Sequence, residues 1–509
     1  MRSKKIIYNI ITNLVLQIVT IIYGFIVPKI IISKYGSDVN GLISSITQFL
    51  AYISLLESGF GPVVKSILYK PIAKKDNKEI SNILKSSEIF FRNISKIFII
   101  YIIILCIFYP IIINNQFDTI FTLSLIIIIS ISTFFEYYFG MTYKLFLQSD
   151  QKTYVISVIQ IVTYLLSIAI IVICSLFNVS IQFLKILSSF AFLLRPIIQN
   201  IYVKKKYNIN LNGDSTYKIK NKWDGLSQHI ASVIHSNTDI TILTFFSKMS
   251  EISVYSVYNL VVSGIKKMVQ VFSSGIDSTF GDMLTKGENE NLNKKFNMYE
   301  LIFLSIVTII FSCTLVLITP FVTIYTKNIH DANYNRFLFG ILIVISEYIC
   351  MIRLPYINLT FAAGHFKETS KGAWIECILN LSISLALVSK FGLIGTTIGT
   401  IVAMGVRTFE FLIHTNSKIL NRSIFISLKK IFILIFETVI ILIISFNMPL
   451  LEFTNYLNFI INSIIILFIA VLIVIINILI FYKKEFLELI LIIKKSLMRR
   501  GVFNDKKND

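Results

Sequence analysis

Long apolar runs recur along the whole chain and are separated by short polar segments. Each run reaches about 20 residues, the length that an α-helix needs to cross the hydrocarbon core of a bilayer. We expect membrane-spanning helices at 6–33, 39–69, 93–115, 119–146, 153–177, 180–203, 224–246, 252–280, 298–326, 334–362, 373–389, 393–414, 430–448 and 457–482. The pattern therefore predicts an all-α membrane protein with about fourteen transmembrane helices.

The composition indicates that lipid is the solvent for most of the chain. Hydrophobic residues make up 55% of the 509 residues and charged residues only 15%, too few to cover a soluble protein. The net charge of +20 lies in short loops rather than on a folded basic domain, which excludes nucleic-acid binding. The cysteines lie singly in apolar runs and the histidines lack zinc-site spacing, so we expect no disulfides, metal or cofactor.

Basic residues are distributed unequally between the two sides of the predicted membrane. If residue 1 is cytoplasmic, the inward segments hold most of the 48 Lys and Arg residues. The outward loops hold only five, namely Lys34, Lys248, Lys327, Arg336 and Lys390. Because cytoplasmic loops are enriched in Lys and Arg, we expect both termini on the cytoplasmic side of a cell membrane.

An internal repeat indicates two similar halves. SKYGSDVNG at 33–41 resembles SKMSEISVY at 247–255, and Arg195 near the end of one span parallels Arg407 near the end of another. Six predicted helices, an even number, separate the copies, so both have the same orientation and their pseudo-two-fold axis follows the membrane normal. We expect an N-terminal six-helix lobe, a C-terminal six-helix lobe, two extra helices and a basic tail, at 1–210, 211–423, 424–482 and 483–509. The stretch 483–500 is expected to lie on the inner membrane surface as an interfacial helix.

Polar side chains recur at helical spacing within several apolar spans. In the eighth span, steps of three and four residues place on one face Ser256, Asn259, Ser263, Lys266, Gln270, Ser274 and Asp277. The sixth, seventh and twelfth spans have similar stripes, formed by Lys185, Ser188, Arg195 and Gln199, by Ser232, His235, Ser236 and Asp239, and by Thr396, Thr400, Arg407, Glu410 and His414. The first two spans have milder ones, formed by Asn9, Asn13, Gln17 and Thr20 and by Ser44, Gln48 and Tyr52. Because polar groups at membrane depth are costly, these faces are expected to meet in a hydrated, mixed-charge cavity between the two halves.

Several intramembrane cations are candidates for binding an anion. Lys266, Lys267 and Arg195 have no carboxylate at i±3 or i±4, which favours a role in the cavity over local pairing. Arg407 and Glu410 lie one turn apart, so mutual pairing and a site role both remain open for them. Arg chelates phosphate oxygens and Lys offers a point charge, so such a cavity suits a phosphate-bearing substrate.

Acidic residues and one histidine in the same stripes are candidates for ion coupling or gating. His235 and Asp239 carry a coupling proton or ion in one interpretation and cap or pack helices in the other. Asp277 and Glu410 are further candidates of this class.

The segment around Glu57 predicts a bend in the second span. Glu57 precedes SGFGP, where Pro62 removes a backbone hydrogen bond. Because a bend here could move its side chain, Glu57 is a candidate for gating. The run GFGPVVKS at 59–66 lacks the glycine that a phosphate loop places before its lysine, and it lies in a span. The chain therefore has no visible site of ATP hydrolysis.

Two segments carry a family resemblance. SKYGSDVNGLISSITQFLAYISLLESGFGPVVKSILYKPIAKKDNKEI at 33–80 and LFLQSDQKTYVISVIQ at 145–160 resemble the early and middle regions of Wzx-type oligosaccharide-lipid flippases of bacterial polysaccharide and O-antigen synthesis. This family shares a superfamily with the multidrug and toxin extruders and the lipid II flippase. The resemblance implies a two-lobed fold with a cationic cavity lined by the first, second, seventh and eighth helices.

The resemblance also implies a function. The substrate would be an undecaprenyl-pyrophosphate-linked oligosaccharide, moved from the cytoplasmic to the outer leaflet by alternating access, with the bilayer, a polysaccharide polymerase and chain-length regulators as partners. Our hypothesis is that Lys266, Lys267, Arg195 and Arg407 bind the pyrophosphate and sugar acids. The sugar hydroxyls would then bind to Asn13, Gln48, Asn259 and Gln270.

Two other functions remain open at this point. A cation-coupled multidrug exporter shares the two-lobed fold but usually has twelve helices and a less basic cavity. A membrane polymerase or ligase acting on lipid-linked sugars generally needs a large external loop, whereas every outward loop here is short. We therefore expect a transporter rather than an enzyme.

Overall fold

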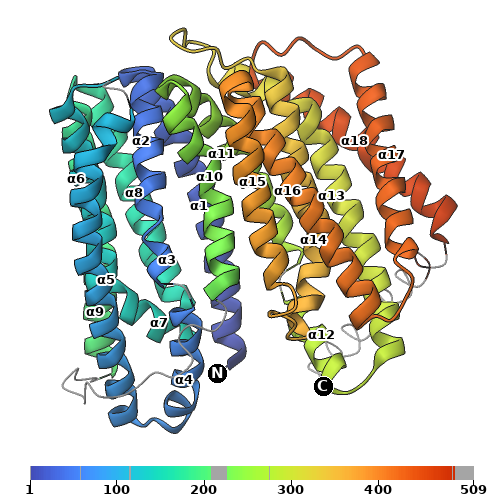
Figure 1. The fold of residues 1–509 in the computed structure, drawn as a ribbon, viewed down its shortest axis with the longest axis horizontal. Coiled ribbons are helices and arrows are strands. Elements are labelled where there is room, and N and C mark those ends of the chain that lie inside the picture. Colours follow the sequence, from blue (N-terminus) through green and yellow to red (C-terminus); the bar gives the residue numbers. More distant parts are fainter. Residues whose placement is uncertain are drawn as a thin grey trace, which may run out of the picture. The chain divides into compact units, whose positions relative to one another are not determined.

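The computed structural model describes residues 2–57, 59–113, 116–207, 226–273, 275–483, 485 and 487. The first helices along the chain are α1 (Arg2–Tyr35), α2 (Ser37–Ala51), α3 (Ser54–Glu57), α4 (Phe60–Lys74), α5 (Asn77–Ile112), α6 (Thr119–Phe135), η1 (Glu136–Gly140), α7 (Met141–Ser149), α8 (Thr153–Leu176), α9 (Ile181–Tyr207), α10 (Leu226–Phe246) and α11 (Met249–Val271) (Figure 1). They continue with α12 (Ile276–Thr285), α13 (Asn289–Tyr325), α14 (Phe337–Ala362), α15 (Ser370–Phe391), α16 (Leu393–His414), η2 (Thr415–Ile419), α17 (Phe425–Asn447) and α18 (Tyr456–Phe481).

The helices reproduce the predicted spans in number and order. Within the described ranges, 11 helical segments are long and apolar enough to cross a membrane. The helices α10, α11 and α17 occupy the other three predicted spans. The prediction of an all-α fold with about fourteen transmembrane helices is confirmed, and the chain is a multi-pass membrane protein.

The second span is divided, but the cause differs from our expectation. α2 ends at Ala51 and α4 begins at Phe60, after Gly59 with a φ of 82°. This left-handed region is open to glycine and disfavoured for other residues. Pro62 lies in the first turn of α4, where a backbone N–H has no partner within the helix in any case. The break is therefore made by Gly59 and not by Pro62.

The eighth span is divided as well. α11 ends at Val271, and α12 begins after Gly275, whose φ is 83°. The stripe that we expected on one helix face from Ser256 to Asp277 is therefore continuous only as far as Gln270. The helical periodicity of the sequence did not reveal this break because polar residues continue at the same spacing through it.

The chain divides into two compact units, which we call unit 1 (Met1–Leu260, Asn328–Tyr334 and Ala373–Thr400) and unit 2 (Val261–Lys327, Asn335–Gly372 and Ile401–Asp509). In unit 1, α8 packs against both α1 and α9, α6 packs against α9, and α2 packs against α10 (Figure 1). These units are defined by packing, and the lobe boundaries at 210 and 423 remain a prediction.

Glycines allow two close helix contacts in unit 1. A Cβ atom on Gly41 of α2 would lie 1.8 Å from the backbone oxygen of Met249, at the start of α11. Gly395 and Gly399 of α16 face the backbone of α15 at similarly short distances, with four-residue spacing. Small residues at this spacing let membrane helices approach closely, because lipid provides no hydrophobic drive for association.

In unit 2, the long helix α13 packs against α14, α17 and α18. Cys313 and Val316 of α13 form a buried apolar cluster with Ile441 of α17 and with Ile466 and Ala470 of α18. The two C-terminal helices are thus attached to the unit by α13.

Candidate functional site

Asp239 lies at the centre of a buried polar site in unit 1. It projects from α10 and is 9% exposed. Tyr255 of α11 donates its hydroxyl to Oδ2 at 2.9 Å, and the Thr400 hydroxyl of α16 lies 3.0 Å from Oδ1. Asn380 of α15 donates its amide to Thr400 at 3.0 Å. Four helices therefore converge on one carboxylate.

The Asp239 site has the chemistry of a proton or small-cation site. Its oxygens come from a carboxylate, hydroxyls and an amide, the ligand types that hard cations prefer. The Oδ1 atom of Asn380 is buried and has no hydrogen-bond partner among the described residues. No group of three or more His, Cys, Asp or Glu side chains in the described part of the chain is arranged to hold a metal ion. The site therefore suits a monovalent ion that one carboxylate can neutralise.

The polar stripe on α2 pairs with α10 of the Asp239 site. Tyr52 shares a hydrogen bond of 2.9 Å with Thr241, and Ser45, which is not part of the predicted stripe, shares one of 2.6 Å with Thr244. Gln48 donates to Asn237. The α2 face that we expected to line a cavity thus carries contacts between two helices.

Other predicted residues of unit 1 also contact neighbouring helices. Asn13 accepts a hydrogen bond of 2.6 Å from Ser157, and Glu57 accepts one of 3.1 Å from Tyr137. Asn259 is half-buried.

Arg195 lies in an aromatic pocket of unit 1. Its Nε donates to Thr163 at 2.8 Å, and its guanidinium lies 4.5 Å from the ring of Tyr164 and 4.4 Å from that of Phe192. Stacking on aromatic faces stabilises a cation in an apolar environment. The Nη2 atom is buried without a hydrogen-bond partner among the described residues, so its two N–H groups remain for an anion.

In unit 2, two predicted cations are paired with carboxylates. Lys266 of α11 forms an ion pair of 2.8 Å with Glu347 of α14. Arg407 is 3% exposed, donates to the carbonyl of Thr369 at 2.7 Å and pairs with Glu410, the pairing that the sequence left open. The search at i±3 and i±4 did not find a partner for Lys266 because the partner lies on another helix.

The remaining predicted site residues are exposed or lie outside the described side chains. Lys267 and Gln270 are exposed on α11. The side chains of His235 and Asp277 lie outside the described residues, as does nearly all of the stretch 483–500.

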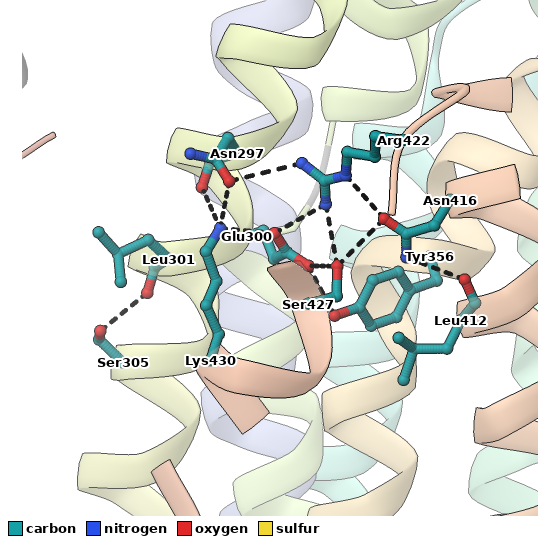
Figure 2. Close-up of polar contacts among 10 residues, drawn as sticks. All are labelled: Asn297, Glu300, Leu301, Ser305, Tyr356, Leu412, Asn416, Arg422, Ser427 and Lys430. Atoms are coloured by element: carbon teal, nitrogen blue, oxygen red, sulfur yellow. Dashed lines mark hydrogen bonds and ion pairs between the residues drawn. The ribbon is translucent and has the colours of Figure 1, made fainter. Parts of the chain in front are cut away.

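The sequence analysis missed a buried charge cluster in unit 2. Figure 2 shows Lys430 and Arg422 pointing toward Glu300, which is fully buried on α13. Lys430 lies 2.6 Å from Oε2 and Arg422 3.1 Å from it. Tyr356 and Ser427 donate to Oε1 at 2.7 and 2.5 Å. The carboxylate thus receives two cations and two hydroxyls, which fills its acceptor capacity.

The Glu300 cluster has only a faint signal in the sequence. Glu300 is a single carboxylate near the start of an apolar span, whereas Arg422 and Lys430 are part of a basic inward segment. No stripe marks the cluster, because its three charged groups come from α13, α17 and the segment between η2 and α17. A search for isolated carboxylates at span ends, paired with nearby basic loops, would have selected Glu300.

Comparisons with known proteins give the fold. No protein-family model and no curated protein sequence matches the chain. The structure is similar to lipid II flippase MurJ in an inward closed conformation, with a TM-score of 0.69 and 15% identity over 94% of this chain and 99% of that chain. It is also similar to an inward-facing multidrug resistance MATE family transporter of the MOP superfamily (TM-score 0.57, 13% identity, 80% of this chain and 98% of that chain). A eukaryotic MATE transporter, AtDTX14, matches with a TM-score of 0.54 at 11% identity over 85% of this chain and 98% of that chain.

These likenesses extend over nearly the whole of each known structure, so they concern the complete helical architecture and not a shared fragment. A structural likeness at 15% sequence identity or less shows the fold and does not identify the substrate. The chain therefore has the fold of the lipid II flippase and of the MATE transporters, and the superfamily that the segments 33–80 and 145–160 resemble has this fold.

Proposed function

We propose that the chain is a flippase that moves undecaprenyl-pyrophosphate-linked oligosaccharides from the cytoplasmic to the outer leaflet by alternating access. The observation that carries this proposal is the likeness to a lipid II flippase over 94% of this chain and 99% of the other. A carrier of this type lowers the barrier to moving a charged headgroup through lipid and performs no covalent chemistry.

The extent of the likeness favours a flippase over a drug exporter. The flippase structure accounts for 94% of this chain, whereas the MATE family transporter accounts for 80%. A multidrug exporter remains the second candidate, because its fold matches with a TM-score of 0.57 and a buried carboxylate such as Asp239 also serves cation coupling.

The positive-inside distribution supports a cell-membrane protein with both termini in the cytoplasm. In this orientation the segments that follow α4, α12 and α16 are cytoplasmic and carry Lys or Arg residues. We propose that the substrate enters from this side and that a polysaccharide polymerase and a chain-length regulator act on it after release.

We propose that the substrate's phosphates bind the intramembrane cations one after another. Lys267 is exposed and accessible to a headgroup. Its neighbour Lys266 is ion-paired with Glu347 and is proposed to bind a phosphate oxygen as well, because an ammonium group has three donors. Arg195 and Arg407 are proposed to assist, and Asn13, Gln48, Asn259 and Gln270 to bind sugar hydroxyls.

Asp239 is proposed as the coupling site. A proton or monovalent cation bound there neutralises the carboxylate that Tyr255 and Thr400 hold, and its release leaves a buried negative charge. Such a change alters which arrangement of α10 and α16 is stable, as alternating access requires.

A genetic experiment tests the proposed function. Deletion of the gene in its native host should cause one lipid-linked glycan to accumulate on the inner leaflet. The wild-type gene should relieve this accumulation, and Asp239→Asn should fail to relieve it although the protein inserts normally. An unchanged pool of lipid-linked glycans after deletion would refute the flippase.

A further inference from the structure

α17 carries two buried charged side chains on one face. Lys430 and Glu437 lie seven residues apart, which is two helical turns, and each is 3% exposed. Between them and the neighbouring helices is a small pocket. It is lined by Ser305 of α13, by Lys430 and Glu437 of α17, and by Asn477 and Tyr482 at the end of α18.

Lys430 is fully engaged elsewhere. An ammonium group has three donors. Those of Lys430 reach the carbonyl of Asn297 at 3.0 Å, the side-chain oxygen of Asn297 at 2.5 Å and Glu300 at 2.6 Å, all on α13 (Figure 2). The nearest cation on the same helix is thus committed to Glu300 and does not pair with Glu437.

Glu437 has a much poorer environment than Glu300. The amide of Asn477 donates to its Oε1. Its Oε2 is buried and has no hydrogen-bond partner among the described residues, and the same holds for Oδ1 of Asn477 and the hydroxyl of Tyr482. An ionised carboxylate with one neutral donor inside a membrane helix pays a large desolvation penalty, and no cation among the described residues pairs with it.

We propose that Glu437 is a proton-binding site, at which the side chain is a neutral carboxylic acid at neutral pH. A hydrogen on Oε2 converts an unsatisfied acceptor into a donor, and Oδ1 of Asn477 is the buried acceptor on the side chain that already binds Oε1. The acid and the amide then satisfy each other, as carboxylic acids and primary amides do in apolar solvents. The bound proton joins α17 to α18.

The charged and titratable groups around the pocket are compatible with a bound proton at Glu437. They are Lys430 of α17, whose charge opposes that of Glu300 on α13, and Tyr348 of α14, which interacts with Glu437 and shares a hydrogen bond with Thr438. Tyr482 of α18 and Glu485 complete the set, and the charge of Glu485 acts on both Lys430 and Tyr482. A metal cation would need more oxygen ligands than the pocket's few polar side chains provide. The Glu437 site is distinct from Asp239, which lies in unit 1, and does not depend on the proposed function.

Infrared spectroscopy of the purified full-length protein at neutral pH tests this proposal. The wild type should show the carbonyl-stretch band of a protonated carboxylic acid. Glu437→Gln should remove a component of this band that Asp239→Asn, at the other proposed proton site, leaves in place. Glu410→Gln is the matched control and should retain the band, because Glu410 is ion-paired with Arg407. Asn477→Leu should retain the band at a shifted frequency, since the acid loses its amide partner.

Three results would overturn the proposal. They are a wild-type spectrum without the band, a band that persists unchanged in Glu437→Gln, and a band that disappears when sodium chloride is added at constant pH. The last would identify a cation in place of the proton. The infrared spectrum of Asn477→Leu tests the proposal even if the Glu437→Gln protein does not fold.

Discussion

Lys266 on α11 forms an ion pair of 2.8 Å with Glu347 on α14, and both side chains are largely shielded from solvent, with 28% and 15% exposed. The pair joins two helices of unit 2 and holds a cation at membrane depth without local compensation on its own helix. Its energy lies between that of an exposed and that of a buried pair, because shielding raises both the attraction and the desolvation cost.

The pair predicts a specific pattern of stability. Lys266→Ala should lower the free energy of unfolding by about 1 to 2 kcal/mol, since Glu347 is left without its partner. Lys266→Ala combined with Glu347→Ala should recover part of this loss. Thermal unfolding in detergent measures both, and additive effects of the two substitutions would contradict the pairing.

The contact between α2 and α11 predicts that Gly41→Ala is strongly destabilising. The added methyl would overlap the backbone oxygen of Met249, and backbone cannot move aside as a side chain can. Gly264→Ala on α11 is the matched control, with no atom within 4 Å of its Cβ position. It should be neutral or stabilising by up to about 1 kcal/mol, because alanine favours a helix more than glycine does. Equal melting temperatures for the two variants would disprove the close contact.

Glu300 is predicted to be the most sensitive carboxylate of unit 2. Glu300→Gln preserves the shape but leaves Lys430 and Arg422 without their anion, which should cost about 3 to 5 kcal/mol. Glu452→Gln changes the same chemical group at an exposed position and should alter stability by less than about 0.5 kcal/mol. Thermal unfolding of the two purified variants gives the comparison, and similar midpoints would exclude a stabilising cluster.

We predict that the protein loses folding stability in acid because of Asp150, which lies between α7 and α8. Burial opposes its ionisation, but hydrogen bonds from Lys152 and Tyr207 and the charges of Lys152 and Lys5 outweigh burial and hold its pKa below the usual value. A carboxyl whose pKa is lowered by folding stabilises the protein above its unfolded pKa, and this contribution is lost as pH falls through the folded pKa.

The difference in melting temperature between the wild type and Asp150→Asn should therefore be largest near neutral pH. It should disappear in acid below the lowered pKa of Asp150. A difference that stays constant across this range would show that the charge of Asp150 does not stabilise the segment.

The helices were predictable because their signal is local. Apolar runs of sufficient length determine the spans, and even α15 and α17, with their polar residues, lie where the runs predicted. The breaks were harder to predict, since Gly59 and Gly275 act through a backbone conformation that a hydrophobic pattern does not show.

The partners of the polar residues were not predictable, because they come from other helices. Glu347 lies on α14, far along the chain from Lys266, so a search one turn away did not reach it. The same reason hid the Glu300 cluster, whose charged groups come from three separate segments of the chain. The sequence places candidate polar residues on a helix face, and tertiary packing decides which of them become pairs.

Translocation by the purified protein tests the central claim most directly. The wild type is reconstituted into liposomes with an undecaprenyl-pyrophosphate-linked oligosaccharide, and an impermeant reagent that modifies the sugar measures how much reaches the opposite leaflet. The account predicts faster transfer than in protein-free liposomes, with slower transfer for Lys267→Ala and Asp239→Asn. Transfer at the protein-free rate by folded protein that moves a small cationic dye would contradict the flippase and favour the drug exporter.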